Sequence, residues 1–211
     1  MAEVIQLAPR RPELGGRRVA PQAPAAAPVT LYFDLASPYT YLVAERVERR
    51  LASAVWRPAV LPEPPARGEE VVAEAKRRAL ALRMPLVWPE RFPSRVPTAM
   101  RVATFANERG CGAAYAVAAG RLAFCGGFDL EDPDILAEAA AAAGVDVDGA
   151  LAAARDPRRD HQVGMAGRAV GHAGGTTLPA LEHDRRVYCG EQHITAWLAQ
   201  AAGAVARPSA S

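Results

Sequence analysis

Hydrophobic positions with strand-like spacing flank a helical segment near the start of the chain. Residues 29–33 (VTLYF) and 53–61 (SAVWRPAVL) are apolar, β-prone runs, while apolar positions recur with helical spacing from Pro38 to Leu51. The order strand, helix, strand implies a right-handed crossover that places the two strands parallel in one sheet. Pro58 fits an edge of that sheet or the end of its strand, because proline donates no ladder hydrogen bond.

The region from residue 66 to residue 173 has helical patterning almost throughout. A helix is predicted over 68–83, and a proline-rich stretch over 84–97 predicts an irregular, packed loop. Thr98, Asp132 and Asp146 are the predicted caps of later helices. These helices are expected over 98–110, 111–124, 132–143, 146–156 and 158–171.

Strand patterns return near the end of the chain. Residues 178–182 and 186–189 flank a hairpin connection, and 191–202 predicts a final helix. The order βαβ, helical block, ββα is that of a thioredoxin fold with an α-helical domain inserted between its two halves. The predicted α/β domain organisation is a thioredoxin-like domain over 29–65 and 174–203, an inserted helical domain over 66–173, a disordered N-terminal tail over 1–28 and a C-terminal tail over 204–211.

The turn between the first strand and the first helix is the leading candidate site. Ser37 stands at the N-cap, and Pro38 occupies the first helical position, where a missing N–H costs nothing. A hydroxyl at this place lies beside the free N–H groups and the positive end of a helix, which favours a thiolate or another anion. The same pattern also begins many helices that carry no chemistry.

Residues 33–42 (FDLASPYTYL) resemble the opening of the 2-hydroxychromene-2-carboxylate isomerases and the kappa-class glutathione transferases, in the DsbA-like branch of the thioredoxin superfamily. Thioredoxin-like oxidoreductases carry Cys-x-x-Cys in this turn, whereas this chain has Ser37 and Thr40 in the two cysteine positions. The resemblance therefore implies that Ser37 hydrogen-bonds the thiolate of bound glutathione, with Pro38 and Tyr39 beside it. It also implies a small-molecule substrate, oriented by Tyr39 and Arg101.

The triplet Thr177-Leu178-Pro179 resembles the cis-proline segment of the same superfamily. The resemblance implies a cis bond before Pro179, close to the Ser37 turn. The backbone of Leu178 would then hold the cysteinyl part of glutathione by strand-like hydrogen bonds. The alternative is an ordinary proline at the start of a strand.

The start of the final helix departs from the pattern of these families. Where they have an Asp that would hold the γ-glutamyl ammonium, this chain has Gln192, and His193 replaces the following Arg. An amide accepts a hydrogen bond but supplies no charge. Glu191 either compensates for the missing acid or is an ordinary acid of a first helical turn.

Residues 88–101 resemble a family segment in which an Asn helps to order the thiol and the substrate. That Asn falls on Arg95 here. Arg95 and Arg101 either clamp a substrate carboxylate in bidentate fashion or are surface residues of an arginine-rich chain.

Composition excludes several classes of function. The formal net charge of +2 is too small to indicate nucleic acid or an anionic membrane surface as a partner. No apolar run approaches the ~18 residues of a membrane span, and no signal peptide is recognised, so a cytoplasmic protein is expected. Cys111, Cys125 and Cys189 form no redox or zinc motif, and the four histidines show no metal-ligand spacing. A homodimer is one option for its assembly.

The sequence and the family resemblance together indicate two candidate functions. The first is an isomerase or transferase that uses glutathione or another low-molecular-weight thiol, with Ser37 stabilising a thiolate that adds to a conjugated carbonyl compound. The second is a DsbA-like domain that has lost catalysis and binds a thiol compound or an extended peptide. A dithiol oxidoreductase is disfavoured, because position 37 has no cysteine.

Overall fold

The computed structural model of the chain describes residues 28–62 and 68–205. The tails predicted at 1–28 and 204–211 therefore lie almost wholly outside the described residues. The exceptions are residue 28 and residues 204 and 205, which continue the last helix.

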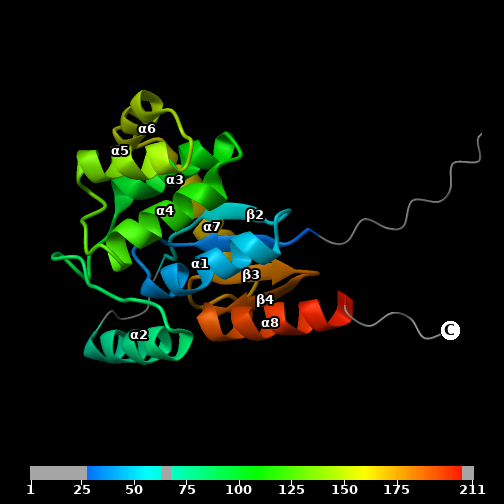
Figure 1. Cartoon of the computed structure of the whole chain (residues 1–211). Helices are drawn as coiled ribbons and strands as arrows, with labels where there is room; N and C mark the ends of the chain where they lie inside the picture. The colour runs from blue at the N-terminus through cyan, green and yellow to red at the C-terminus, as the bar shows by residue number, and fades with distance from the viewer. Residues whose placement is uncertain (1–27, 63–67, 206–211) are drawn as a thin grey trace, which may run out of the picture.

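One mixed sheet of four strands lies at the centre of the described chain, in the order β2-β1-β3-β4 (Figure 1). Strand β1 (Thr30–Phe33) pairs in parallel with β2 (Val55–Pro58), with Thr30 opposite Val55. It pairs antiparallel with β3 (Ala180–His183), which in turn pairs antiparallel with β4 (Arg186–Cys189). The predicted parallel pair and the edge position of Pro58 are confirmed, although β2 is shorter than the predicted 53–61.

Helices make up most of the rest of the described chain, close to the predicted places. The caps at Asp132 and Asp146 are confirmed, since each carboxylate accepts a backbone N–H of the helix that follows it. The helices are α1 (Pro38–Arg50), α2 (Glu69–Leu82), α3 (Pro97–Glu108), α4 (Gly112–Phe124), α5 (Pro133–Ala142), α6 (Val147–Ala154), α7 (Arg159–His172) and α8 (Gly190–Val205).

The predicted cap at Thr98 is wrong, because the cap of α3 is Val96 and Pro97 opens the helix. Thr98 has another partner. Its N–H and its hydroxyl both donate to Glu131 Oε1, at 3.0 and 2.7 Å. A carboxylate 33 residues away in the sequence thus takes the free N–H that a local cap would have satisfied.

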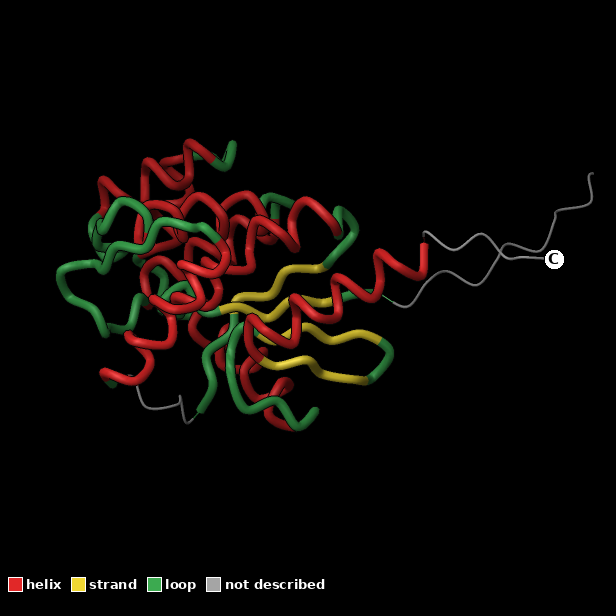
Figure 2. The backbone as a smooth tube through the Cα atoms, turned by 60° about the horizontal axis from the view of Figure 1, so that its bottom comes forward, coloured by secondary structure: helices red, strands yellow, loops and turns green. Residues whose placement is uncertain are grey.

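The sheet is buried on both faces, because its side chains alternate between two hydrophobic clusters. Leu31 and Phe33 belong to a large cluster shared with α1, α3, α4 and α8, whereas Tyr32 and Ala180 pack with Val170 of α7. Helices α1 and α8 therefore lie on one face and α7 on the other (Figure 1), and Figure 2 shows the strands with helices packed around them. Helix α7, which the sequence assigned to the inserted domain, is thus part of the sandwich around the sheet.

A glycine permits this close approach of α7. A Cβ atom on Gly167 would lie 1.8 Å from the carbonyl oxygen of Val60, in the segment that follows β2. The Val60 N–H also donates to the Val163 carbonyl oxygen of α7, at 3.4 Å. The helix backbone can reach the segment after β2 only because residue 167 has no side chain.

A buried carboxylate joins the start of α8 to α1 and α2. Glu191 Oε1 accepts hydrogen bonds from Arg46 of α1 at 2.7 Å and from Thr195 at 2.8 Å, and Glu191 Oε2 accepts one from Arg78 of α2 at 2.9 Å. The Glu191 side chain is 1% exposed. Helix α2 stands apart from the block of α3 to α6 in Figure 1, and this network ties it to α1 and α8.

We expect Gly167→Ala to destabilise the protein by about 2–3 kcal/mol, because the added methyl group overpacks the contact with Val60. The measurement is chemical denaturation at neutral pH. Gly171→Ala, in the same helix, is the matched control, because its added Cβ would have no atom within 4 Å, and it should be neutral or slightly stabilising. Equal stabilities for the two variants would show that the contact between Gly167 and Val60 leaves room for a methyl group.

We expect Glu191→Gln to cost about 3 kcal/mol at neutral pH, because it leaves two guanidinium groups without their buried partner. Burial raises the pKa of the Glu191 carboxyl, but hydrogen bonds from Thr195, Arg46 and Arg78 outweigh it and leave that pKa below its usual 4.5. The stabilisation is therefore complete above pH ~4.5 and is lost as the pH falls through the lowered pKa of the folded state.

The check is the free energy of unfolding of wild type and variant, measured from pH 7 down to pH 3. The difference should stay constant above pH ~5 and shrink below pH ~4. Glu45→Gln is the control, because Glu45 also pairs with two arginines, Arg49 and Arg121, but its side chain is 24% exposed. That variant should lose less than about 1 kcal/mol.

Candidate functional site

The site begins at the tight turn between β1 and α1. The Ser37 N–H donates to the Asp34 carbonyl oxygen at 3.0 Å, and the Ala36 N–H donates to Asp34 Oδ1 at 2.8 Å. Ser37 is the N-cap residue of α1, as predicted, but its side chain makes no capping hydrogen bond. The hydroxyl donates instead to the carbonyl oxygen of Leu178, at 3.3 Å. The Ser37 side chain therefore points across to the start of β3 rather than along its own helix.

The segment before β3 closes the other side of the site. The Leu178–Pro179 bond is cis, as predicted, and lies beside the Ser37 turn through the hydrogen bond to Leu178. The Gly190 N–H donates to the Pro179 carbonyl oxygen at 2.8 Å, which fixes the start of α8 against the same segment. The turn, the cis-proline segment and the start of α8 thus meet, although 141 residues separate Ser37 from Leu178.

A cavity of about 410 Å³ opens at this junction. Among the residues that line it are six of the predicted site residues: Ser37, Pro38, Tyr39, Leu178, Glu191 and Gln192. Sequence reasoning missed a wall from α2, made by Val71 and Glu74, and a contribution from Phe92. Val71 and Glu74 are three residues apart, so they share one helical face, but no local pattern indicates that this face turns toward Ser37.

Glu191 lines this cavity with a carboxylate that is already satisfied. Both of its oxygens accept from guanidinium groups, and Thr195 supplies a further hydrogen bond. The neighbouring Gln192 is exposed, and its Nε2 donates to Glu74 Oε1 at 3.2 Å. The first turn of α8 therefore presents an amide to the cavity, while its one acid serves the contacts among α1, α2 and α8.

The Tyr39 hydroxyl is held in its neutral form. Burial, followed by the nearby negative charge of Glu74, raises the pKa of this phenol above its usual value of 10.0. A neutral phenol can donate a hydrogen bond to an anion in the cavity.

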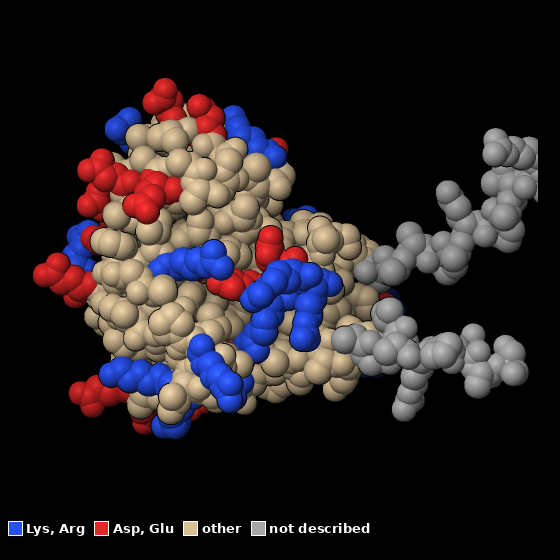
Figure 3. Space-filling model, in the orientation of Figure 1, with Lys and Arg blue, Asp and Glu red and all other residues tan. Residues whose placement is uncertain are grey.

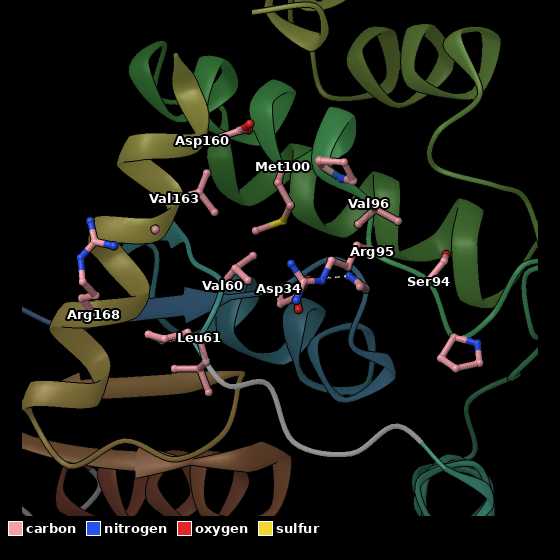
Figure 4. A pocket seen from close by; sticks show the side chains of 15 residues that line it. Asp34, Val60, Leu61, Ser94, Arg95, Val96, Met100, Asp160, Val163 and Arg168 are labelled. Atoms are coloured by element: carbon pink, nitrogen blue, oxygen red, sulfur yellow. Dashed lines mark hydrogen bonds between the residues drawn. The ribbon is translucent and has the colours of Figure 1, made fainter. Parts of the chain in front are cut away.

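A second cavity of about 590 Å³ adjoins the first and shares Asp34, Ala36 and Leu61 with it. Its walls carry the apolar side chains of Val60, Met100 and Val163, while Arg95 and Arg168 approach from opposite sides (Figure 4). Arg95 is the one predicted site residue that lies in this cavity rather than in the first.

Arg101 lies in neither cavity lining and is not an ordinary surface residue. Its guanidinium makes a two-point ion pair with Asp160 of α7, with both N···O distances 2.7 Å, and donates to the Ala154 carbonyl oxygen at 3.0 Å. The hydrogen bond to Asp160 raises the pKa of Arg101. The predicted contact of Arg101 with substrate is therefore not supported by its position, because the side chain joins α3 to α6 and α7.

Three other features of the described ranges bear on the class of site. Over residues 28–62 and 68–205, no cluster of three or more His, Cys, Asp or Glu side chains is arranged to hold a metal ion. In the same part of the chain, no helix is long and apolar enough to cross a membrane. Basic and acidic side chains lie close together on the face shown in Figure 3.

Comparison with solved structures finds this fold in several proteins. A 2-hydroxychromene-2-carboxylate isomerase is 17% identical, with 85% of this chain and 96% of that chain covered and a TM-score of 0.70. A probable DsbA oxidoreductase from Streptomyces coelicolor is 23% identical, with 88% and 93% covered and a TM-score of 0.65. The cytosolic disulfide reductase DsbM from Pseudomonas aeruginosa with GSH is 16% identical, with 84% and 98% covered and a TM-score of 0.62. At these identities the likeness establishes the fold alone.

A comparison with curated protein sequences gave no match. A comparison with protein families matched residues 28–194 to the DSBA-like thioredoxin domain. The match includes the Ser37 turn, the inserted helices, the cis-proline segment and the first turn of α8. Since it spans well over half of the 211 residues, the chain belongs to the DSBA-like thioredoxin domain family.

Proposed function

We propose that the protein is an isomerase or transferase that uses glutathione or a related low-molecular-weight thiol, and that Ser37 stabilises the thiolate. The observation that supports this most is the Ser37 hydroxyl, which lines the cavity and donates to the Leu178 carbonyl oxygen. A donor held at this point, beside the start of α1, suits an anion that binds between the turn and the cis-proline segment. Among proteins of this fold, an isomerase and a reductase with GSH are both known.

The residues present fit a small thiol. Leu178 offers backbone groups of the kind that hold an extended cysteinyl unit, and Pro38 and Tyr39 line the same cavity. Ser37 would turn its hydroxyl from Leu178 to the sulfur, which needs only rotation about one side-chain bond. A bound thiolate supplies a nucleophile that adds reversibly to a conjugated carbonyl compound. The positive end of α1 and the Ser37 hydroxyl lower the pKa of the thiol, and its proton leaves to solvent.

The second cavity would hold the electrophile. It shares the turn residues Asp34 and Ala36 with the thiol cavity, so a compound bound there lies against the thiol site. Arg95 would bind a carboxylate of that compound, and the apolar walls would hold its body. The work of this site is positioning, since proximity and orientation alone accelerate such an addition strongly. We place this activity in the cytoplasm, where a free thiol is available.

One observation favours the second candidate function, a binding domain without catalysis. The only acid in the first turn of α8 is occupied by Arg46 and Arg78, so a thiol ligand finds no free carboxylate there. A domain of this kind would still bind a thiol compound or an extended peptide along Leu178. Ionisation of the bound thiol distinguishes the two functions.

If Ser37 stabilises a thiolate, Ser37→Ala should raise the pKa of bound glutathione without abolishing its binding. A hydrogen bond to a charged acceptor is worth ~1.5–3 kcal/mol, which corresponds to about one to two pKa units. The measurement is the thiolate absorbance of the bound thiol, titrated against pH in wild type and variant. Ser53→Ala, an exposed serine that lines neither cavity, is the control.

A wild type that binds glutathione without ionising it would favour the binding domain over the enzyme. A wild type that binds no thiol would contradict both candidate functions. In the enzyme, turnover of a conjugated carbonyl substrate by Ser37→Ala should fall roughly ten- to hundredfold near neutral pH. The loss should be smaller at alkaline pH, where the thiol ionises unaided.

We also expect no dithiol–disulfide exchange, because hydroxyl side chains occupy both positions of the redox pair, Ser37 and Thr40. Insulin reduction with a thiol reductant is the assay. Turnover that survives replacement of Cys111, Cys125 and Cys189 by serine would contradict the proposal. Loss of turnover on replacing Cys189 alone would indicate a one-cysteine mechanism.

A further inference from the structure

A carboxylate on α2 has no role in the function described so far. Glu74 lines the same cavity as Ser37, Tyr39 and Leu178. It is partly buried, with its side chain 33% exposed, and helix α2 brings it to the start of α8. A carboxylate partly removed from water attracts a cation more strongly than one in bulk water.

The other carboxylates that line this cavity are occupied by the fold. Asp34 is buried and accepts the Ala36 N–H within the turn. Glu191 is buried, and its two oxygens receive Arg46, Arg78 and Thr195. A cationic group that enters the cavity would have to break these contacts to reach either acid.

Glu74 is held more loosely and in a defined direction. Its Oε2 pairs with Arg77 of the same helix, whose side chain is 70% exposed, and such a solvent-exposed pair contributes little. Its Oε1 accepts the Gln192 amide at 3.2 Å. The Gln192 amide therefore positions the Glu74 carboxylate from the side of α8. The two carboxylate oxygens of Glu74 keep lone pairs for a ligand.

The charge of Glu74 also reaches the thiol end of the cavity. Its negative charge is the second cause, after burial, of the raised pKa of the Tyr39 hydroxyl. Tyr39 follows Ser37 by two residues at the start of α1. One cavity therefore combines a donor suited to a thiolate with a carboxylate suited to a cation.

We propose that Glu74 binds the ammonium group of the thiol ligand, and so selects thiols that carry a primary amine. This inference rests on the proposed thiol-binding function and adds to it the feature of the ligand that the site recognises. Gln192 is a positioning residue in this arrangement. The ligand class is a cysteinyl thiol with a free amino group on its γ-linked arm, of which glutathione is the available probe.

The test compares glutathione with its analogue that lacks the γ-glutamyl amino group, by titration calorimetry at pH 7 with the full chain. Wild type should bind glutathione on the order of tenfold more tightly than the analogue. Glu74→Gln should bind both ligands equally. Glu70→Gln removes the same charge from an exposed residue one turn earlier that lines neither cavity, and it should keep the wild-type preference.

The outcomes separate this inference from the proposed function. If wild type binds both thiols equally, or if Glu74→Gln keeps the preference, Glu74 is not the ammonium site, while thiol binding stands. If wild type binds neither thiol, both proposals fall. Thermal unfolding of the variants shows that they are folded, and Gln192→Ala supplies a second check. It should reduce the preference only in part, because Glu74 keeps its charge but loses its orienting partner.

Discussion

The buried Glu191 carboxylate is the contact on which the arrangement of the site depends. It lies in the first turn of α8 and receives guanidinium groups from α1 and α2, so three elements that are distant in sequence meet at one side chain. A carboxylate removed from water needs partners of this kind, since an unpaired buried charge is costly. Helix α2 also buries Ala75 and Ala79 against the protein, and the ion pair from Arg78 to Glu191 ties the wall that carries Glu74 to the start of α8.

This network also explains how a thioredoxin sheet acquires a cavity with a helical wall. The sheet presents the Ser37 turn and the Leu178–Pro179 segment at one end, and α1 and α8 cover the same face. Those elements alone would leave the turn open to solvent. Helix α2, from the inserted region, closes one side of the cavity, and Phe92 from the following loop contributes to its lining. The insertion therefore completes the site instead of standing beside it as a separate domain.

Local patterns in the sequence were sufficient to predict most of the fold. Apolar, β-prone runs located β1 and β2, a hairpin pattern located β3 and β4, proline and aspartate marked several helix starts, and Pro58 marked the sheet edge. The Ser37 turn and the cis bond before Pro179 could be predicted because both depend on short motifs. Long-range contacts account for what the sequence could not predict. The cap at Thr98 was wrong, because Thr98 bonds Glu131. Arg101, which the sequence left open between a substrate contact and a surface residue, pairs with Asp160.

The same limit applies to the acids of the site. From the sequence, Glu191 could be either a ligand contact or an ordinary first-turn acid, and nothing nearby in the chain decides between them. The decision comes from Arg46 and Arg78, which lie 145 and 113 residues away and reach the carboxylate only in the folded state. Glu74 could not be recognised as a site residue from the sequence. Its sequence context is that of a charged helix surface, and its place in the cavity depends on how α2 docks.

The position of the two cavities constrains any chemistry between them. They meet at the turn formed by Asp34, Ala36 and their neighbours, so compounds bound in the two spaces approach one another beside the start of α1. The Asp34 carboxylate is buried and accepts the Ala36 N–H within that turn. Under the proposed function, this shared turn would place the thiol and the electrophile next to one another. In the proposed enzyme, the Ser37 hydroxyl would set the reactivity of the bound thiol, and the fold would set its direction of attack.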